Sequence, residues 1–335
     1  MRKTRIVYRV DGGVKEGYGH IYRGINLQKV FQKNRDVKIF FLVKKDLRGY
    51  QFLKKKIKKN VFFIKNIKNE FEIITSLSPK LVIFDTLNTE KRLFKLLVKK
   101  KFRIAVFEDF GNKAKNFANL IFNCNSEGPI KKIKKIKRGT KYLGAPYKIF
   151  GPKIEKYRNL KKNNQMLTIS FGGGEVHKGE ILNLIRKLHN SLKIYNLKIN
   201  LILGPGVKNS TIKILKKENF NIKIYQDLKN IYSLLNKSKF LITGGGGTVY
   251  EGAYFKCKIF CFARNSHQKE NIKKFEKNKL CIEIKKLDKN YLFNFFRNNL
   301  SFKNKSRNKK FSSNIIKNNG LYLVKRILLK QLNDN

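Results

Sequence analysis

Two glycine-rich loops constrain this chain more than any other feature of its sequence. Gly17-Tyr18-Gly19-His20 follows the strand-like run Thr4–Val10, and Gly244-Gly245-Gly246-Gly247-Thr248 follows the strand-like run Lys239–Ile242. Each segment is typical of a strand that turns on glycines into the start of a helix, where free N–H groups and the helix dipole face one point. Because glycine has no Cβ, phosphate oxygens can approach such a loop closely. The pair predicts a phosphate-bearing ligand held in a cleft between two domains.

The rest of the chain alternates short β-branched or aromatic runs with amphipathic segments, and the pattern restarts after the Gly- and Pro-containing segment 144–164. Such alternation is typical of parallel sheets covered by helices on both faces. We therefore expect an α/β protein of two Rossmann-like, doubly wound domains facing a central cleft. The first spans residues 1–155, and the second spans 156–335 and includes a terminal helix. The expected strands are Thr4–Val10, Val37–Val43, Val61–Ile64, Lys80–Asp85, Phe102–Phe107, Met166–Phe171, Leu197–Leu203, Ile222–Tyr225, Lys239–Ile242 and Lys258–Phe262, and the expected helices include His20–Gln32, Leu47–Lys58, Glu90–Lys100, Ile181–Leu188, Leu228–Leu235, Gln268–Lys277 and Asn314–Leu332.

The strongly positive net charge of the chain raises the question of anionic binding partners. Lys and Arg number 77 against 22 Asp and Glu, a formal net charge of +55. The lysines are spread over both halves in runs such as Lys54–Lys56, Lys99–Lys101 and Lys131–Lys137, which favours solvated faces. A weak association with an anionic membrane surface stays open, and nucleic acid is not the expected partner. No apolar stretch is long enough to cross a bilayer, so a cytoplasmic location is expected. The four cysteines lack the spacing of a zinc site and are predicted to be reduced thiols.

Polar residues gather around the first loop. His20 is expected in the first turn of a helix, where the dipole disfavours an imidazolium, so a neutral ring can take a proton from water. Alternatively, His20 hydrogen-bonds the loop backbone. Asp11 either orients His20 or the substrate, or braces the loop by accepting N–H groups. Arg23, one turn after His20, either faces phosphate or forms an ion pair.

Two nucleotide-binding motifs are absent from these loops. Gly17-x-Gly19 lacks the third glycine of a dinucleotide fingerprint, and neither loop continues into the Gly-Lys-Ser/Thr of a P-loop. A kinase or a dehydrogenase is therefore disfavoured.

Short motifs recur in a fixed order over roughly residues 4–285. They are Arg9-Val10-Asp11 with Gly17–Arg23, Leu81–Asp85, Phe107-Glu108-Asp109, Ser170–Gly173 and Gly244–Glu251. In this order they resemble the UDP-sugar hydrolases of the pseudaminic acid pathway, which belong with a group named after a spore-coat polysaccharide biosynthesis protein. The chain departs from the hydrolases at Asp85-Thr86-Leu87-Asn88, where they usually continue with His/Ser-Tyr-Gly.

The resemblance implies a GT-B-like fold, shared with the peptidoglycan enzyme that transfers N-acetylglucosamine to a lipid-linked acceptor. It implies a diphosphate on Gly245, Gly246, Gly247 and Thr248, and ribose hydroxyls on Glu251. For Glu251 a second interpretation, an acid favoured by the helix dipole, stays open. The remaining substrate or phosphate contacts would come from Gly17, Gly19, Arg23, Gly173, Gln268 and Asn271.

The resemblance also implies a reaction. Water would attack the anomeric carbon of a UDP-linked diacetamido-trideoxy sugar and UDP would leave with inversion, without a metal or other cofactor. His20 would act as the base or position the water, and Asp11 and Asp85 would be the other catalytic residues. Two alternatives remain: a GT-B glycosyltransferase, in which an acceptor hydroxyl replaces water, and a basic nucleic-acid-binding protein.

Overall fold

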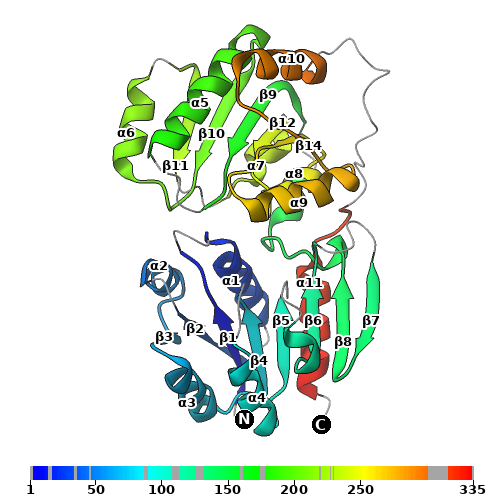
Figure 1. Cartoon of the computed structure of the whole chain (residues 1–335). Coiled ribbons are helices and arrows are strands. Elements are labelled where there is room, and N and C mark those ends of the chain that lie inside the picture. The colour runs from blue at the N-terminus through cyan, green and yellow to red at the C-terminus, as the bar shows by residue number, and fades with distance from the viewer. Residues whose placement is uncertain are drawn as a thin grey trace. The chain divides into compact units, whose positions relative to one another are not determined.

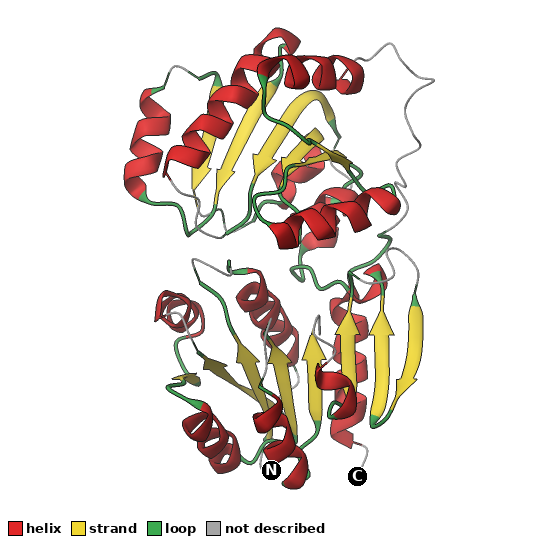
Figure 2. Cartoon of the chain, in the orientation of Figure 1, coloured by secondary structure: helices red, strands yellow, loops and turns green. Residues whose placement is uncertain are grey.

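The structure is a computed structural model, and its described residues form two compact units. The first is Met1–Lys153 with Asn318–Asn335, and the second is Ile154–Lys317. Each unit is a sheet with helices packed on its faces (Figures 1 and 2). The structure describes the chain apart from residues 1–2, 14–16, 34–35, 45–46, 87–89, 108–112, 126–130, 159–160, 174–177, 219, 227, 229, 301–315 and 334–335.

The sheet of the first unit has the strand order β3-β2-β1-β4-β5-β6-β8-β7. Its pairs are parallel except β7 with β8, which is antiparallel. The strands are β1 Thr4–Val10, β2 Val37–Val43, β3 Val61–Phe63, β4 Leu81–Asp85, β5 Ile104–Phe107, β6 Leu120–Asn123, β7 Lys132–Ile136 and β8 Gly139–Leu143; the helices are α1 Gly19–Phe31, α2 Leu47–Ile57, α3 Ile67–Leu77, α4 Lys91–Lys99 and α11 Gly320–Asn333, with short 3₁₀ turns at Lys113–Asn116 and Ala145–Tyr147.

Alternation along the central strands builds two cores in this unit. Ile6, Tyr8 and Val10 of β1 point into the core that α1 and α11 cover, whereas Val7 points into the core on the opposite face. Both faces are therefore apolar, as the continuous hydrophobic run of β1 predicts for a central parallel strand.

The sheet of the second unit has the order β11-β10-β9-β12-β13-β14, and all its pairs are parallel. Its core is formed mainly by Leu, Ile and Phe side chains of these strands with α5 and α10. The strands are β9 Asn163–Ser170, β10 Lys198–Leu203, β11 Ile222–Gln226, β12 Ser238–Thr243, β13 Lys258–Cys261 and β14 Ile282–Glu283; the helices are α5 Lys178–Leu192, α6 Asn209–Lys217, α7 Tyr232–Lys237, α8 Thr248–Tyr254, α9 Ser266–Lys277 and α10 Lys289–Leu300, with 3₁₀ turns at Ile154–Tyr157 and Lys193–Tyr195.

The terminal helix differs from its expected place. We predicted that it belongs with residues 156–335, but α11 lies in the first unit, where Leu321, Val324 and Leu328 are buried against the sheet. Asn319 fixes the return of the chain, because it accepts a hydrogen bond from Phe150 N at 3.0 Å and donates one to Gly151 O at 3.1 Å. Gly320 begins this helix, and a Cβ there would lie 2.6 Å from the carbonyl oxygen of Lys148.

Other elements also differ from the sequence-based expectation, and strands β6 and β14 were not predicted. The hairpin of β7 and β8 was not predicted, because its lysine-rich first strand carries no apolar pattern. The helix predicted at Leu228–Leu235 is α7, Tyr232–Lys237, which starts four residues later.

Candidate active site

The carboxyl ends of β1 and β4 bring the first group of polar residues together. The two strands are parallel neighbours with Val10 opposite Asp85, so Asp85 ends β4 next to the point where the chain leaves β1. Helix α1 then begins at Gly19 and places His20 and Arg23 one turn apart on one face. Ligands of open α/β sheets bind at this edge.

His20, Arg23 and Tyr8 converge on Asp85. The Oδ1 atom of Asp85 lies 2.5 Å from Nδ1 of His20 and 2.5 Å from Nη2 of Arg23. Its Oδ2 atom accepts hydrogen bonds from Nε of Arg23 and from the hydroxyl of Tyr8, each at 2.7 Å. The guanidinium of Arg23 also lies over the ring of Phe107, 5.1 Å from its centroid. Of the two interpretations of Arg23, the structure shows the ion pair.

Asp85 is fully buried, and its surroundings keep it charged. Burial raises the pKa of the carboxyl group, but the charges of Arg23 and His20 outweigh this effect and lower the pKa to about 2. Burial and the neighbouring carboxylate raise the pKa of Tyr8 well above its usual value, so its hydroxyl remains a donor. An ionised Asp85 therefore accepts two charge-assisted hydrogen bonds from Arg23 as well as the bond from Tyr8.

Two groups compete for Nδ1 of His20: the Asp85 carboxylate can accept its proton, and Nη2 of Arg23, a donor only, lies 2.9 Å from it. When Nδ1–H donates to Asp85, the other ring nitrogen, Nε2, carries the lone pair. The His20 side chain is 13% exposed, and within the described residues no hydrogen bond involves its Nε2. In the tautomer with the proton on Nδ1, the ring is held by a buried anion and has its acceptor at Nε2, an arrangement suited to a general base.

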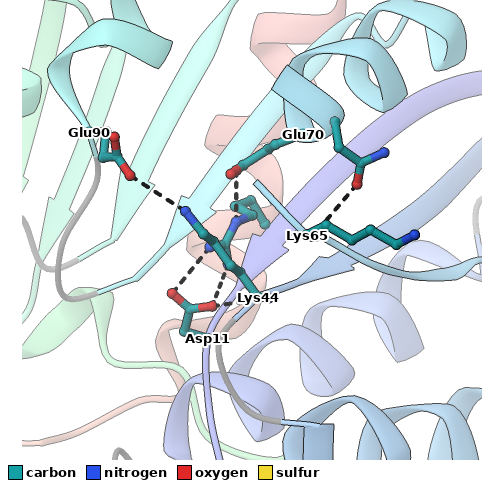
Figure 3. A network of polar contacts seen from close by, with 7 residues as sticks. Asp11, Lys44, Lys65, Glu70 and Glu90 are labelled. Carbon is teal, nitrogen blue, oxygen red and sulfur yellow. Dashed lines mark hydrogen bonds and ion pairs between the residues drawn. The ribbon is translucent and has the colours of Figure 1, made fainter. Parts of the chain in front are cut away.

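Asp11 was predicted to act beside His20 or to brace the loop, and its contacts fit the second alternative. Figure 3 shows it in a separate buried network, in which Nη1 of Arg9 donates to Asp11 at 2.7 Å and Nε of Arg9 donates to Glu70 at 2.7 Å. The backbone N–H of Lys44 donates to Asp11 at 3.2 Å, and Lys44 Nζ lies 3.4 Å from Glu90. Burial lowers the pKa of Arg9, but Glu70 and Asp11 outweigh it and raise that pKa above its usual value. Among the described residues, no hydrogen bond or ion pair joins Asp11 to His20.

Glycine occupies the positions in and beside the first loop for different structural reasons. Gly17 has a φ of 77°, which a residue with a Cβ rarely adopts, and its carbonyl accepts the N–H of Gly13 at 3.0 Å. Gly19 has open space around the position of a Cβ. A Cβ on Gly49 of α2 would lie 1.8 Å from the carbonyl oxygen of Gly12, so α2 packs directly onto this loop.

The packing of α9 constrains part of the second glycine loop. A Cβ on Gly245 would lie 2.4 Å from the carbonyl oxygen of Gln268, and one on Gly244 would lie 2.9 Å from its Oε1. A side chain on either glycine would therefore collide with Gln268 of α9, so the packing of α9 is one reason for glycine at both positions. Gly246 and Gly247 are exposed, and a Cβ on Gly246 would meet nothing within 4 Å.

The other predicted residues of the second unit lie around this loop. Asn271 is buried and donates from Nδ2 to the carbonyl oxygen of Gly245 at 3.2 Å, while Oε1 of Gln268 accepts the N–H of Arg264 at 3.2 Å. Thr248 and Glu251 lie half-buried in the first turn of α8. Gly173 is at the ends of β9 and β10, where its carbonyl accepts the N–H of Gly206 at 3.1 Å.

The loop geometry predicts different effects for two neighbouring substitutions. Gly245→Ala should lower the free energy of unfolding by roughly 1–3 kcal/mol, because the new methyl group overlaps backbone atoms of Gln268. Gly246→Ala is the matched control and should leave the thermal midpoint nearly unchanged. Equal midpoints for both variants would show that α9 does not constrain the loop.

Sequence reasoning missed two residues and named others that the structure does not describe. Tyr8 and Glu70 were missed, although Tyr8 shares a face of β1 with Val10, the partner of Asp85. The motif residues Leu87, Asn88, Glu108 and Asp109 lie outside the described residues.

Comparison with known proteins identifies the fold. No family model matches the chain. An uncharacterized protein of Methanocaldococcus jannaschii is 24% identical over 282 residues, 79% of this chain but only 57% of that protein. MurG of Acinetobacter baumannii has a TM-score of 0.68 at 11% identity, with 98% of this chain and 99% of MurG covered. UGT2 of Phytolacca americana, solved with UDP-2-fluoro-glucose and pterostilbene, has a TM-score of 0.69 at 10% identity, with the same coverage.

The chain has the GT-B fold. A UDP-GlcNAc 2-epimerase of Methanocaldococcus jannaschii also matches, with a TM-score of 0.56 at 13% identity over 98% of this chain and 99% of the epimerase. A protein solved with UDP-2-fluoro-glucose and an epimerase named for UDP-GlcNAc thus share the GT-B architecture with this chain. The prediction of two doubly wound α/β domains is confirmed.

Proposed function

We propose that this chain is a UDP-sugar enzyme, a hydrolase that removes UDP from a UDP-linked diacetamido-trideoxy sugar. The observation that carries the proposal is the contact between the buried Asp85 carboxylate and Nδ1 of His20, 2.5 Å apart. Through this contact Asp85 orients His20, the proposed base beside the glycine turn of the first unit. The fold supports the substrate class, because UGT2 was solved with UDP-2-fluoro-glucose and the UDP-GlcNAc 2-epimerase of Neisseria meningitidis was solved with UDP-GlcNAc.

In the proposed reaction, Nε2 of His20 takes a proton from water while the water oxygen attacks the anomeric carbon. The bond between that carbon and the diphosphate oxygen breaks, and UDP leaves with the bonding electrons. Attack from the face opposite the leaving group inverts the configuration. Asp85 stabilises the imidazolium that forms, because its carboxylate already accepts the Nδ1–H.

The second unit would hold the nucleotide. Gly246, Gly247 and Thr248 lie where β12 gives way to α8, and Gly246 leaves open space for an oxygen ligand. Glu251 follows in the first turn, from which a carboxylate can accept two ribose hydroxyls. In this proposal Asn271 positions the loop through its bond to Gly245.

A glycosyltransferase is the second candidate, because MurG and UGT2 share the fold and an acceptor hydroxyl can replace water at the same base. Incubation with a panel of UDP-N-acetyl and UDP-diacetamido sugars, without any acceptor, separates the two candidates. A hydrolase releases UDP and the free sugar with inverted configuration. Release that requires an added acceptor hydroxyl favours the transferase, and no turnover in either arm contradicts both.

The nucleotide assignment gives a prediction for Glu251. Glu251→Ala should weaken UDP binding by roughly 1–3 kcal/mol, since charge-assisted hydrogen bonds to the ribose are lost. Isothermal titration with UDP measures this, and phosphate or pyrophosphate serves as the control ligand without ribose. Equal loss of affinity for pyrophosphate would place Glu251 in the support of the loop rather than at the ribose.

A further inference from the structure

One corner of the first unit combines exposed apolar side chains with lysines. Helix α2 and edge strand β3 lie side by side there (Figure 1), and the rings of Tyr50 and Phe63 meet edge-on with centroids 5.5 Å apart. Leu47 is 55% exposed, Phe62 37% and Phe63 36%. We call Leu47, Lys54, Lys55, Lys56 and Phe63 the α2–β3 surface.

The segment that builds this corner carries positive charge. Between Leu47 and Asn69 the chain carries eight cationic residues and no acidic one. The three lysines of the α2–β3 surface end α2 and are exposed, as are Lys58 and Lys59 directly after it. Within the described residues, no helix is long and apolar enough to span a membrane. A partner for this corner therefore has to be anionic and has to accept apolar side chains at its surface.

The arrangement of the rings disfavours single-stranded nucleic acid as that partner. Bases stack on open aromatic faces, but Lys54 Nζ covers the ring of Tyr50 at 5.6 Å and Lys56 Nζ covers that of Phe52 at 5.2 Å. Phe62 and Phe63 are consecutive strand residues and point to opposite faces of the sheet, so they form no common platform. The aliphatic Leu47 has no base-stacking role.

A lipid surface matches both properties. Apolar side chains enter the boundary of headgroups and acyl chains, while lysines extend their charged ends to anionic headgroups. We propose that the α2–β3 surface binds the surface of an anionic bilayer. This inference does not depend on the reaction. One consequence rests on the proposed function: α2 packs on the loop before His20 through Gly49 and Gly12, so docking would hold that loop near the membrane.

Sedimentation with phosphatidylcholine vesicles, with and without phosphatidylglycerol, tests the proposal on the full chain. The wild-type protein should bind the vesicles with phosphatidylglycerol and not the neutral ones. Replacing Lys54, Lys55 and Lys56 by Gln should weaken binding roughly 100-fold, from about fivefold per charge near the surface. Leu47→Asn should weaken it about tenfold, the effect of burying one leucine.

Two matched controls distinguish this surface from the general positive charge. Lys132, Lys134 and Lys135 are exposed on β7, and their replacement by Gln removes the same charge elsewhere. Ile194 is 59% exposed in the second unit, so Ile194→Asn matches Leu47→Asn. Both controls should bind like the wild type. Equal losses in the controls and the α2 variants would overturn the proposal, as would tighter binding to polyuridine that the α2 substitutions abolish.

Discussion

Replacing His20 by alanine should lower kcat at least about 100-fold and leave the affinity for UDP nearly unchanged. The reason is that His20 supplies the acceptor for the proton of the nucleophile, while the proposed nucleotide contacts lie in the second unit. Steady-state kinetics on the substrate found in the panel, together with titration of UDP, measure both quantities.

His189→Ala is the matched control, because His189 is a half-buried histidine in the second unit that packs against Phe220, and its replacement should leave kcat near the wild-type value. Unchanged turnover in His20→Ala would remove the base from the mechanism. Equal loss in both variants, with a lower thermal midpoint, would attribute the effect to folding.

Asp85→Asn is expected to affect both catalysis and stability. Its amide can donate to Nδ1 of His20 and so place the proton on Nε2, which blocks the base; loss of the correct tautomer in a comparable His–Asp pair costs on the order of 1,000-fold or more in kcat. The substitution also leaves Arg23 buried without its anion, which should lower the free energy of unfolding by about 3–5 kcal/mol. Tyr8→Phe is the control: it removes one hydrogen bond but keeps all charges, and should cost about 1 kcal/mol.

The pH dependence of unfolding checks the same residue. Because folding lowers the pKa of Asp85 from 3.8 to about 2, its contribution is fully present above pH 3.8 and is lost as the pH falls towards 2. The contribution is about 2 kcal/mol for this fully buried group. Denaturant unfolding of the wild type should show this extra loss, and Asp85→Asn should not. Parallel pH profiles of the two proteins would contradict the ion-paired state of Asp85.

The sequence alone determined the layers of this protein and the positions of its loops. Apolar runs of strand length, separated by amphipathic segments, require two-sided parallel sheets, because a strand that is apolar on both faces has to be covered on both. Glycines at the ends of Thr4–Val10 and Lys239–Ile242 mark where each sheet turns into a helix. His20 and Asp85 were recognisable because they sit at such strand and helix ends, a position that local pattern reveals.

Only the tertiary structure decided which of these residues meet. His20 is paired with Asp85 and not with Asp11, because the end of β4 lies opposite the first turn of α1. This contact joins residues that are 65 positions apart in the chain. Tyr8 was hidden because its apolar neighbours made it a core residue by pattern, and its hydroxyl finds Asp85 only through the pairing of β1 with β4.

The partners of the terminal helix and of the second loop were likewise decided by the tertiary structure. The apolar stripe of α11 fits either unit by periodicity, and the hydrogen bonds of Asn319 to Phe150 and Gly151 assign it to the first. Gly244 and Gly245 look like ligand-binding glycines in sequence, yet α9 occupies the space beside them. Periodicity reports which face of an element is buried, but the partner that buries it is set by packing between distant segments.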